Sequence, residues 1–142
     1  MASHRDLKAW QRAKTLAVGC LRISRAFPAD EQDHGLADRL RRAATSAALN
    51  IAEGCNRGSN KDFRKFLETA RTSLDEVEAI VEIANEAGYI RDEVRRELQA
   101  RCDEAAWRLY GLLRAINLRI ESGEVDRSRR IGTKPEQGHP PA

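Results

Sequence analysis

The chain has 142 residues, a net charge of +3 and 33% charged residues, which fits one soluble domain that buries its own core. No apolar run reaches the roughly 18 residues that a membrane-spanning helix needs, and no apolar leader precedes the first charged segment. Three widely spaced cysteines, an odd number, fit reduced thiols in a cytoplasmic protein better than a disulfide framework.

The first helix is expected from about Leu7 to Phe27, after a capping-box pattern at Ser3 and Asp6 and before Pro28. Its apolar positions are Trp10, Ala13, Leu16, Ala17, Cys20, Leu21, Ile23 and Phe27. They spread over an arc of roughly 160°, which is wider than one bundle interface needs. A monomer would leave part of this arc in water, so the pattern favours an oligomer.

The second helix is expected from about Leu36 to Asn56. Its apolar face consists of Leu36, Leu40, Ala43, Ala44, Ala47, Ala48, Ile51 and Cys55. Because this face is mostly alanine, we expect a neighbouring helix to approach it closely.

The third helix is expected to begin after Gly58, with Ser59 and Asp62 at capping-box spacing, and to end near Ala87 before Gly88. Its apolar positions are Phe63, Phe66, Leu67, Ala70, Leu74, Val77, Ile80, Val81 and Ala84. They lie on one side of the helix, as one buried face requires.

The fourth helix is expected from Asp92, as N-cap, to about Ile120. Its core positions are Val94, Leu98, Cys102, Ala105, Leu109, Leu112, Leu113, Ile116 and Ile120. The charged, Gly- and Pro-bearing segment 123–142 is expected to be a disordered tail. Short connections predict an all-α, antiparallel up-down-up-down four-helix bundle over residues 1–122.

The second helix also carries a polar stripe beside its alanine face, at spacings of three and four residues. The stripe consists of Arg39, Arg42, Ser46, Asn50, Glu53 and Arg57. One interpretation is a solvated helix face. In the other, the stripe faces opposite charges on the antiparallel third helix and forms a hydrogen-bonded seam that fixes register. The expected pairs are Arg42 with Asp75 and Glu76, Arg39 with Glu78, and Glu53 with Arg64.

Several motifs carry a family resemblance. The central ones are Arg41-Arg42-Ala43-Ala44-Thr45-Ser46, Asn50-Ile51-Ala52-Glu53-Gly54 and Arg57. Supporting segments are 7–13, Phe27-Pro28, 66–70, 73–76 and Gly88-Tyr89-Ile90. Over residues from about 4 to 120 the chain resembles the bacterial four-helix-bundle family, also called the ribosomal intervening-sequence or S23 protein family. It departs at Arg71-Thr72, where the family often has Gly, and at Ala47-Ala48.

The resemblance implies a bundle that assembles into a ring, with a homopentamer as the expected state. Some relatives are encoded within intervening sequences of ribosomal RNA genes. Others resemble basic accessory subunits of diversity-generating retroelements, which contact a reverse transcriptase and nucleic acid. The resemblance carries over no catalytic residue.

Residue types that would support catalysis or metal binding are not brought together by the predicted helices. His4, His34 and His139 lie in termini or a loop, so no helix carries the Glu-x-x-His pair of a di-iron bundle or a Ser-His or Cys-His pair. Cys-x-x-Cys pairs and phosphate-binding Gly-rich loops are absent, and each cysteine lies in or beside an apolar face. We therefore expect no enzyme, metal or cofactor.

Trp107 lies about 150° from the centre of the core face of the fourth helix, in a row with Arg114. An exposed tryptophan beside small residues favours a subunit contact, with stacking on a nucleobase as the weaker alternative. The candidate subunit contacts are Trp10, Trp107, Gly111 and Leu118.

Two functions are therefore carried forward. The first is a ring-forming module with weak, salt-sensitive affinity for RNA or DNA. Its candidate phosphate contacts are Arg12, Arg22, Arg25, Arg101, Arg108 and Arg119. The alternative is a scaffolding oligomer that binds a protein partner without nucleic acid, for which the acidic row of the third helix offers a docking surface. That row is Asp75, Glu78, Glu82 and Glu86.

Overall fold

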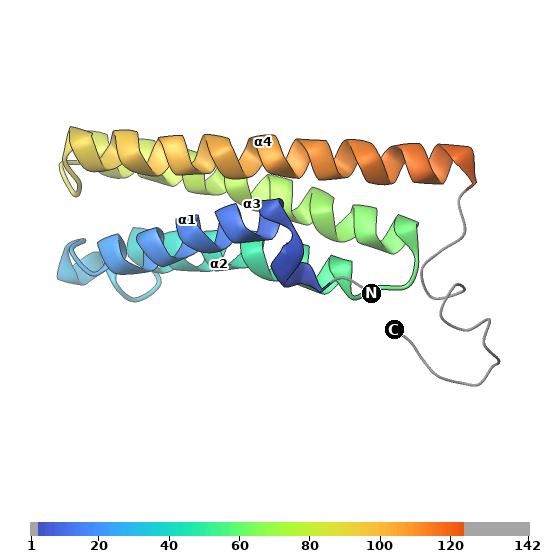
Figure 1. The fold of residues 1–142 in the computed structure, drawn as a ribbon. Helices are drawn as coiled ribbons and strands as arrows, with labels where there is room; N and C mark the ends of the chain where they lie inside the picture. The colour runs from blue at the N-terminus through green and yellow to red at the C-terminus, as the bar shows by residue number, and fades with distance from the viewer. Residues whose placement is uncertain (1–2, 124–142) are drawn as a thin grey trace.

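The computed structural model describes residues 3–123 of the chain. Its α-helices are α1 Lys8–Ser24, α2 Leu36–Cys55, α3 Asn60–Glu86 and α4 Asp92–Ser122 (Figure 1). Short 3-10 turns at His4–Asp6 and Ala29–Glu31 precede α1 and α2. This range holds no strand, so the predicted all-α class is confirmed. Apart from Gly123, which caps α4, the predicted tail lies outside the described residues.

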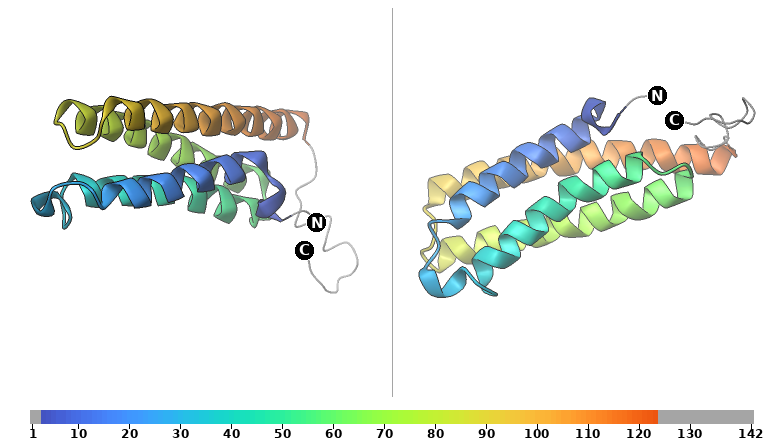
Figure 2. Two further views of the ribbon diagram at one scale, coloured as in Figure 1. Left: turned by 60° about the vertical axis from the view of Figure 1, so that its left-hand side comes forward. Right: turned by 90° about the horizontal axis from the view of Figure 1, so that it is seen from below.

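The four helices surround one core. α1 packs on α2, α2 on α3 and α3 on α4, and α4 returns to α1. Figure 1 shows consecutive helices running in opposite directions, as their short connections require. The right-hand view of Figure 2 places α1 and α3 at opposite edges of the four-helix bundle. Across residues 3–123, no helix combines the length and apolar character needed to cross a membrane.

Local sequence signals explain both ends of α3. Ser59 caps α3 by accepting a hydrogen bond from the Asp62 N–H at 3.0 Å. Gly88 follows α3 with φ of +82°, the left-handed conformation that ends helices and favours glycine. The Ser3 side chain instead caps the first 3-10 turn, through the Arg5 N–H, and α1 starts only after Leu7. The predicted N-cap at Asp92 is wrong, because this residue lies inside the first turn of α4.

The core contains the apolar faces that the periodicity predicts. Leu16, Leu40, Leu67 and Leu109 are fully buried, one from each helix. The alanine face of α2 is also buried, and it allows α2 and α3 to approach closely. Burial of these faces supplies most of the favourable free energy of folding.

The wide apolar arc of α1 is only partly covered by the bundle. Phe27 is buried and contacts the Tyr89 ring, with 5.5 Å between the centroids. Trp10 is half-buried, against the His4 ring and below the Lys14 ammonium. Val18 and Leu21 remain 37% and 36% exposed, so a narrow apolar strip of α1 is left on the surface.

Candidate functional site

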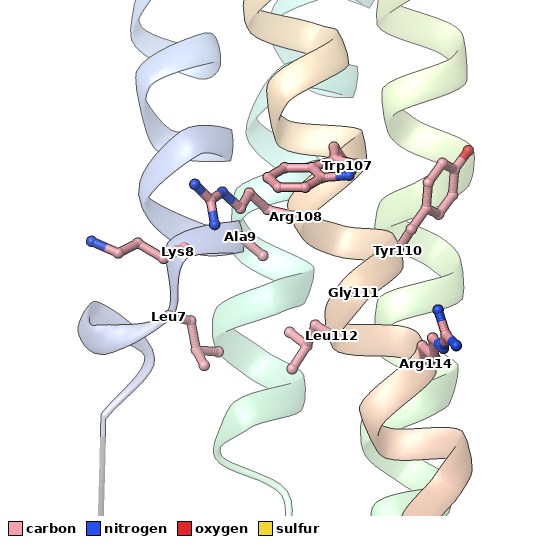
Figure 3. Close-up of a pocket in the computed structure, with 9 residues that line it drawn as sticks. All are labelled: Leu7, Lys8, Ala9, Trp107, Arg108, Tyr110, Gly111, Leu112 and Arg114. Atoms are coloured by element: carbon pink, nitrogen blue, oxygen red, sulfur yellow. The ribbon is translucent and has the colours of Figure 1, made fainter.

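The first candidate site is a cleft of about 440 Å³ between the start of α1 and the middle of α4. Its lining residues are Leu7, Lys8, Ala9, Trp107, Arg108, Tyr110, Gly111, Leu112 and Arg114. In Figure 3, Trp107 and Arg108 extend from α4 on the side of α1, while Tyr110 and Arg114 lie on the other side of α4. We call this the aromatic cleft.

The aromatic cleft combines exposed rings with positive charge. Trp107 is 64% exposed and Tyr110 is 51% exposed. The guanidinium carbon of Arg108 lies 4.7 Å from the centroid of the Trp107 ring, which is a cation–π contact. Lys8 and Arg114 also line the cleft, and its lining residues include no carboxylate. Gly111 leaves its part of the cleft open, because a Cβ atom there would have no heavy atom within 4 Å.

Glu104 joins α1 and α4 beside this cleft. One of its carboxylate oxygens accepts hydrogen bonds from Arg12 at 3.2 Å and Arg108 at 3.1 Å. The hydrogen bonds from Arg108 and Arg12 lower the pKa of Glu104, so the carboxylate stays charged between the two guanidinium groups. Two of the predicted phosphate contacts are thus held in place around one acidic side chain.

A second groove, of about 490 Å³, continues along α1 and α4. Lys14, Arg22 and Arg101 line it, and Arg101 forms an ion pair with Glu97. A Cβ atom on Gly19 would lie 2.7 Å from a guanidinium nitrogen of Arg101, so this glycine leaves room for the arginine between the helices. Of the other predicted phosphate contacts, Arg25 is exposed after α1 and Arg119 is exposed in the last turn of α4.

The predicted seam between α2 and α3 forms only in part. Arg39 pairs with Glu76 at 2.8 Å, and the Ser46 and Ser73 hydroxyls lie 2.9 Å apart. Asn50 donates to the Ser46 carbonyl and hydroxyl oxygens, so the inner edge of the stripe is connected.

The outer pairs of the seam were predicted wrongly. Arg42 pairs with Asp38, and Glu53 pairs with Arg57, both within α2. Arg64 donates to Asn117 of α4 at 3.4 Å. The Arg42 and Glu53 side chains are 73% and 54% exposed, so neighbours one turn away on the same helix are nearer than those on α3. The register also differs by two residues from the predicted pair of Arg39 with Glu78, and neither Glu78 nor Asp75 has an ion pair among the described residues.

Sequence analysis missed a polar cluster at the end of the bundle that holds the α1–α2 connection. Arg41 donates to the Ser24 hydroxyl at 3.1 Å and to the side-chain and backbone oxygens of Gln32 at 3.1 and 2.6 Å. The Gln32 amide in turn donates to the carbonyls of Ser24 and Phe27. The sequence signal that could have indicated this cluster was Arg41, a charged residue of the family motif. The α1–α2 connection near it has few apolar residues.

The candidate subunit contacts do not form one surface. Trp107, Gly111 and Leu118 lie exposed on α4, whereas Trp10 lies on α1 and is half-buried. Leu118 is 59% exposed and lies outside the aromatic cleft. The exposed members of this set therefore all lie on α4, where Tyr110 is exposed as well.

Cys20, Cys55 and Cys102 are buried, and none of them forms a disulfide within residues 3–123. Burial is the main cause that raises the pKa of Cys20 and of Cys102 to about 12. Within residues 3–123 no cluster of His, Cys, Asp or Glu could hold a metal ion.

We expect Cys20 and Cys102 of the native protein to react far more slowly with a disulfide reagent at mildly alkaline pH than the thiols of the urea-unfolded chain, because reactivity follows the thiolate. Unfolded thiols ionise near the ordinary value of 9.0, so the free energy of unfolding should also fall as the pH rises above it. The measurement is the absorbance of the thiol that the reagent releases, with and without urea. Rapid release by native protein would contradict burial of these side chains.

A family model described as 23S rRNA-intervening sequence protein matches residues 5–111. The fold is also similar to a crystal structure of a protein of unknown function from the S23 ribosomal protein family of Bacteroides thetaiotaomicron. The TM-score is 0.69 at 20% sequence identity, over 74% of this chain and 97% of that chain. At this identity the likeness concerns the fold alone. Comparison with curated proteins gives no match.

Proposed function

This chain belongs to the 23S rRNA-intervening sequence protein family, and on that premise we propose that it is a non-enzymatic, cytoplasmic homo-oligomer that contacts RNA or DNA. The assembly is a ring, with five copies as the family resemblance implies. The aromatic cleft of each copy is the nucleic-acid contact.

The composition of the aromatic cleft is the observation that carries this proposal. Proteins that bind single strands combine aromatic side chains, on which bases stack, with cations that follow the phosphates. The cleft offers Trp107 for stacking, with Arg108 beside it, Lys8 on α1 and Arg114 on the other side of α4, and its lining residues include no carboxylate. Such contacts position a strand without selecting its sequence.

Assembly makes a weak site useful. One cleft presents a thin stacking platform compared with the several aromatics of strong single-strand binders. Several copies in a ring would bind one strand at linked sites, which raises the apparent affinity without new contacts. The exposed Val18 and Leu21 of α1 support association, because a contact between copies would cover them.

Replacing Trp107 with Ala should weaken binding of a single-stranded oligonucleotide by about 1–3 kcal/mol, about 5- to 150-fold in Kd, since one stacked base is lost. Trp107→Phe should retain most of the affinity. Leu118→Ala is the matched control, because this residue is similarly exposed on α4 but lies outside the cleft. Fluorescence anisotropy with RNA and DNA strands, at several salt concentrations, is the measurement.

The salt dependence of the binding affinity, measured in the same titrations, provides a second test. Arg114→Ala should lower the slope of log K against log salt by about one, as loss of one phosphate contact does. Absence of any complex with RNA or DNA at low salt would remove nucleic-acid binding from the proposal. A Leu118→Ala variant as weak as Trp107→Ala would instead place the contact outside the cleft.

The alternative is a scaffold that binds a protein partner without nucleic acid. The exposed Trp107, Tyr110 and Leu118 of α4 favour it, because large exposed aromatic and apolar side chains are typical of protein interfaces. A partner captured by the native chain, resistant to nuclease and lost in Leu118→Ala as well as Trp107→Ala, would support the scaffold.

A further inference from the structure

Two outer faces of the bundle carry opposite charges that the described residues leave unpaired. The outer side of α1 and its following turn, which we call the basic face, exposes Lys14, Val18, Leu21, Arg22 and Arg25. Within residues 3–123, none of its three cations has a carboxylate partner, although most arginines of the helices do. A surface that is both cationic and partly apolar is suited to an acidic protein face.

The outer side of α3, which we call the acidic face, exposes Asp75, Glu78, Glu82 and Glu86 at spacings of three and four residues. No ion pair engages these four carboxylates in the described part of the chain, whereas Glu68 and Glu76 of the same helix are paired. Ile83 is 55% exposed beside them. The acidic face is thus opposite in charge to the basic face, and like the basic face it exposes apolar side chains.

The two faces point away from each other within one copy. α1 and α3 each pack against α2 and α4 and occupy opposite edges of the bundle (Figure 2). They also run in the same direction, because one antiparallel helix separates them. The basic face of one copy can therefore meet the acidic face of the next, and repetition of that contact by rotation closes a ring.

The interhelical contacts determine how the residues of the two faces are aligned along the bundle axis. Arg41 of α2 contacts Ser24 of α1, and it lies between the α2 residues that contact Glu76 and Ser73. Ser24 is therefore nearly level with Glu76. Arg22 and Arg25 then lie within one helical turn of Asp75 and Glu78, and both pairs have the same spacing of three residues.

We infer that the ring closes by a head-to-tail contact in which the basic face of α1 receives the acidic face of α3 from a second copy, with Arg22 opposite Asp75 and Arg25 opposite Glu78. This inference rests on the proposed assembly and names its two surfaces. It assigns Arg22 and Arg25 to the subunit contact rather than to phosphate, and it leaves the aromatic cleft open to nucleic acid.

Charge reversal tests the contact. Arg22→Glu with Arg25→Glu, and separately Asp75→Arg with Glu78→Arg, should each raise the protomer concentration for half-dissociation at least about tenfold, because like charges then face each other. The chain that carries all four changes should regain assembly. Arg5→Glu with Arg91→Glu is the matched control for the arginine pair, since it changes the net charge by the same amount at exposed positions outside both faces. Light scattering after size exclusion gives the mass, and circular dichroism verifies that each variant folds.

The possible outcomes separate this contact from the proposed ring. Loss of assembly in both double variants, with recovery in the fourfold variant, supports the contact. A wild-type oligomer that persists in both pairs of reversals, or a fourfold variant no better than either pair, overturns the contact and leaves the ring proposal intact. A wild-type chain that stays a protomer at every concentration removes the ring and this contact together.

Discussion

Replacing Arg41 with Ala is expected to lower the free energy of unfolding by about 2–4 kcal/mol. One hydrogen bond to a charged group contributes about 1.5–3 kcal/mol, and the three bonds of this guanidinium do not add in full because they share one side chain. The variant also leaves part-buried acceptors of Ser24 and Gln32 without their donor. Urea denaturation followed by circular dichroism measures the change.

Arg42→Ala is the matched control for this prediction. Arg42 is the next residue along the chain, but its side chain is 73% exposed and its ion pair with Asp38 lies within α2. Exposed pairs of this kind contribute little, so the control should change the free energy of unfolding by no more than about 0.5 kcal/mol. Equal losses in the two variants would show that the polar cluster does not determine the effect, because Arg→Ala does not lower helix propensity at either position.

The same cluster gives a physical reason for three separate sequence motifs. Arg41 belongs to the central motif, and Phe27 ends the first predicted helix. Tyr89, from the connection after α3, contacts the Phe27 ring and donates to Glu31 at 3.1 Å. That hydrogen bond is the main cause that raises the pKa of Tyr89. Segments far apart in sequence therefore close one end of the bundle.

Helix positions and core residues could be predicted because they depend on a repeating pattern. Leu40, Leu67 and Leu109 recur with other apolar residues near 3.6-residue spacing, and burial of such a face decides the fold largely regardless of side-chain detail. The Ser59 cap and Gly88 end were predictable for a similar reason, since each signal acts within one helical turn.

Long side chains could not be assigned in the same way. Arg39, Arg42 and Arg64 were each given a partner from helix register alone, but an arginine reaches several neighbours and the nearest carboxylate can lie on its own helix. The aromatic cleft was predicted only through Trp107, Arg108, Gly111 and Arg114 of α4. Its other residues come from the start of α1 and from α4, and only the packed structure brings those segments together.

Gly54→Ala should lower the free energy of unfolding by about 1–2 kcal/mol, although the same change usually stabilises a helix by about 1 kcal/mol. Gly54 ends the family motif 50–54 and lies in the last turn of α2, against α3. A Cβ atom there would lie 2.8 Å from Phe63 Cδ1 and 2.8 Å from Phe66 Cβ. Phe63 is 3% exposed, so its ring has little room to move.

Gly111→Ala makes the same chemical change in α4, where a new Cβ atom would meet nothing within 4 Å. It should raise the free energy of unfolding by about 0.5–1 kcal/mol, as expected when only helix propensity changes. Chemical denaturation of both variants therefore gives opposite signs if close packing of α2 on α3 requires glycine at position 54. Stabilisation by both would mean that α3 can shift away from α2, and the motif would then need an explanation other than close helix packing.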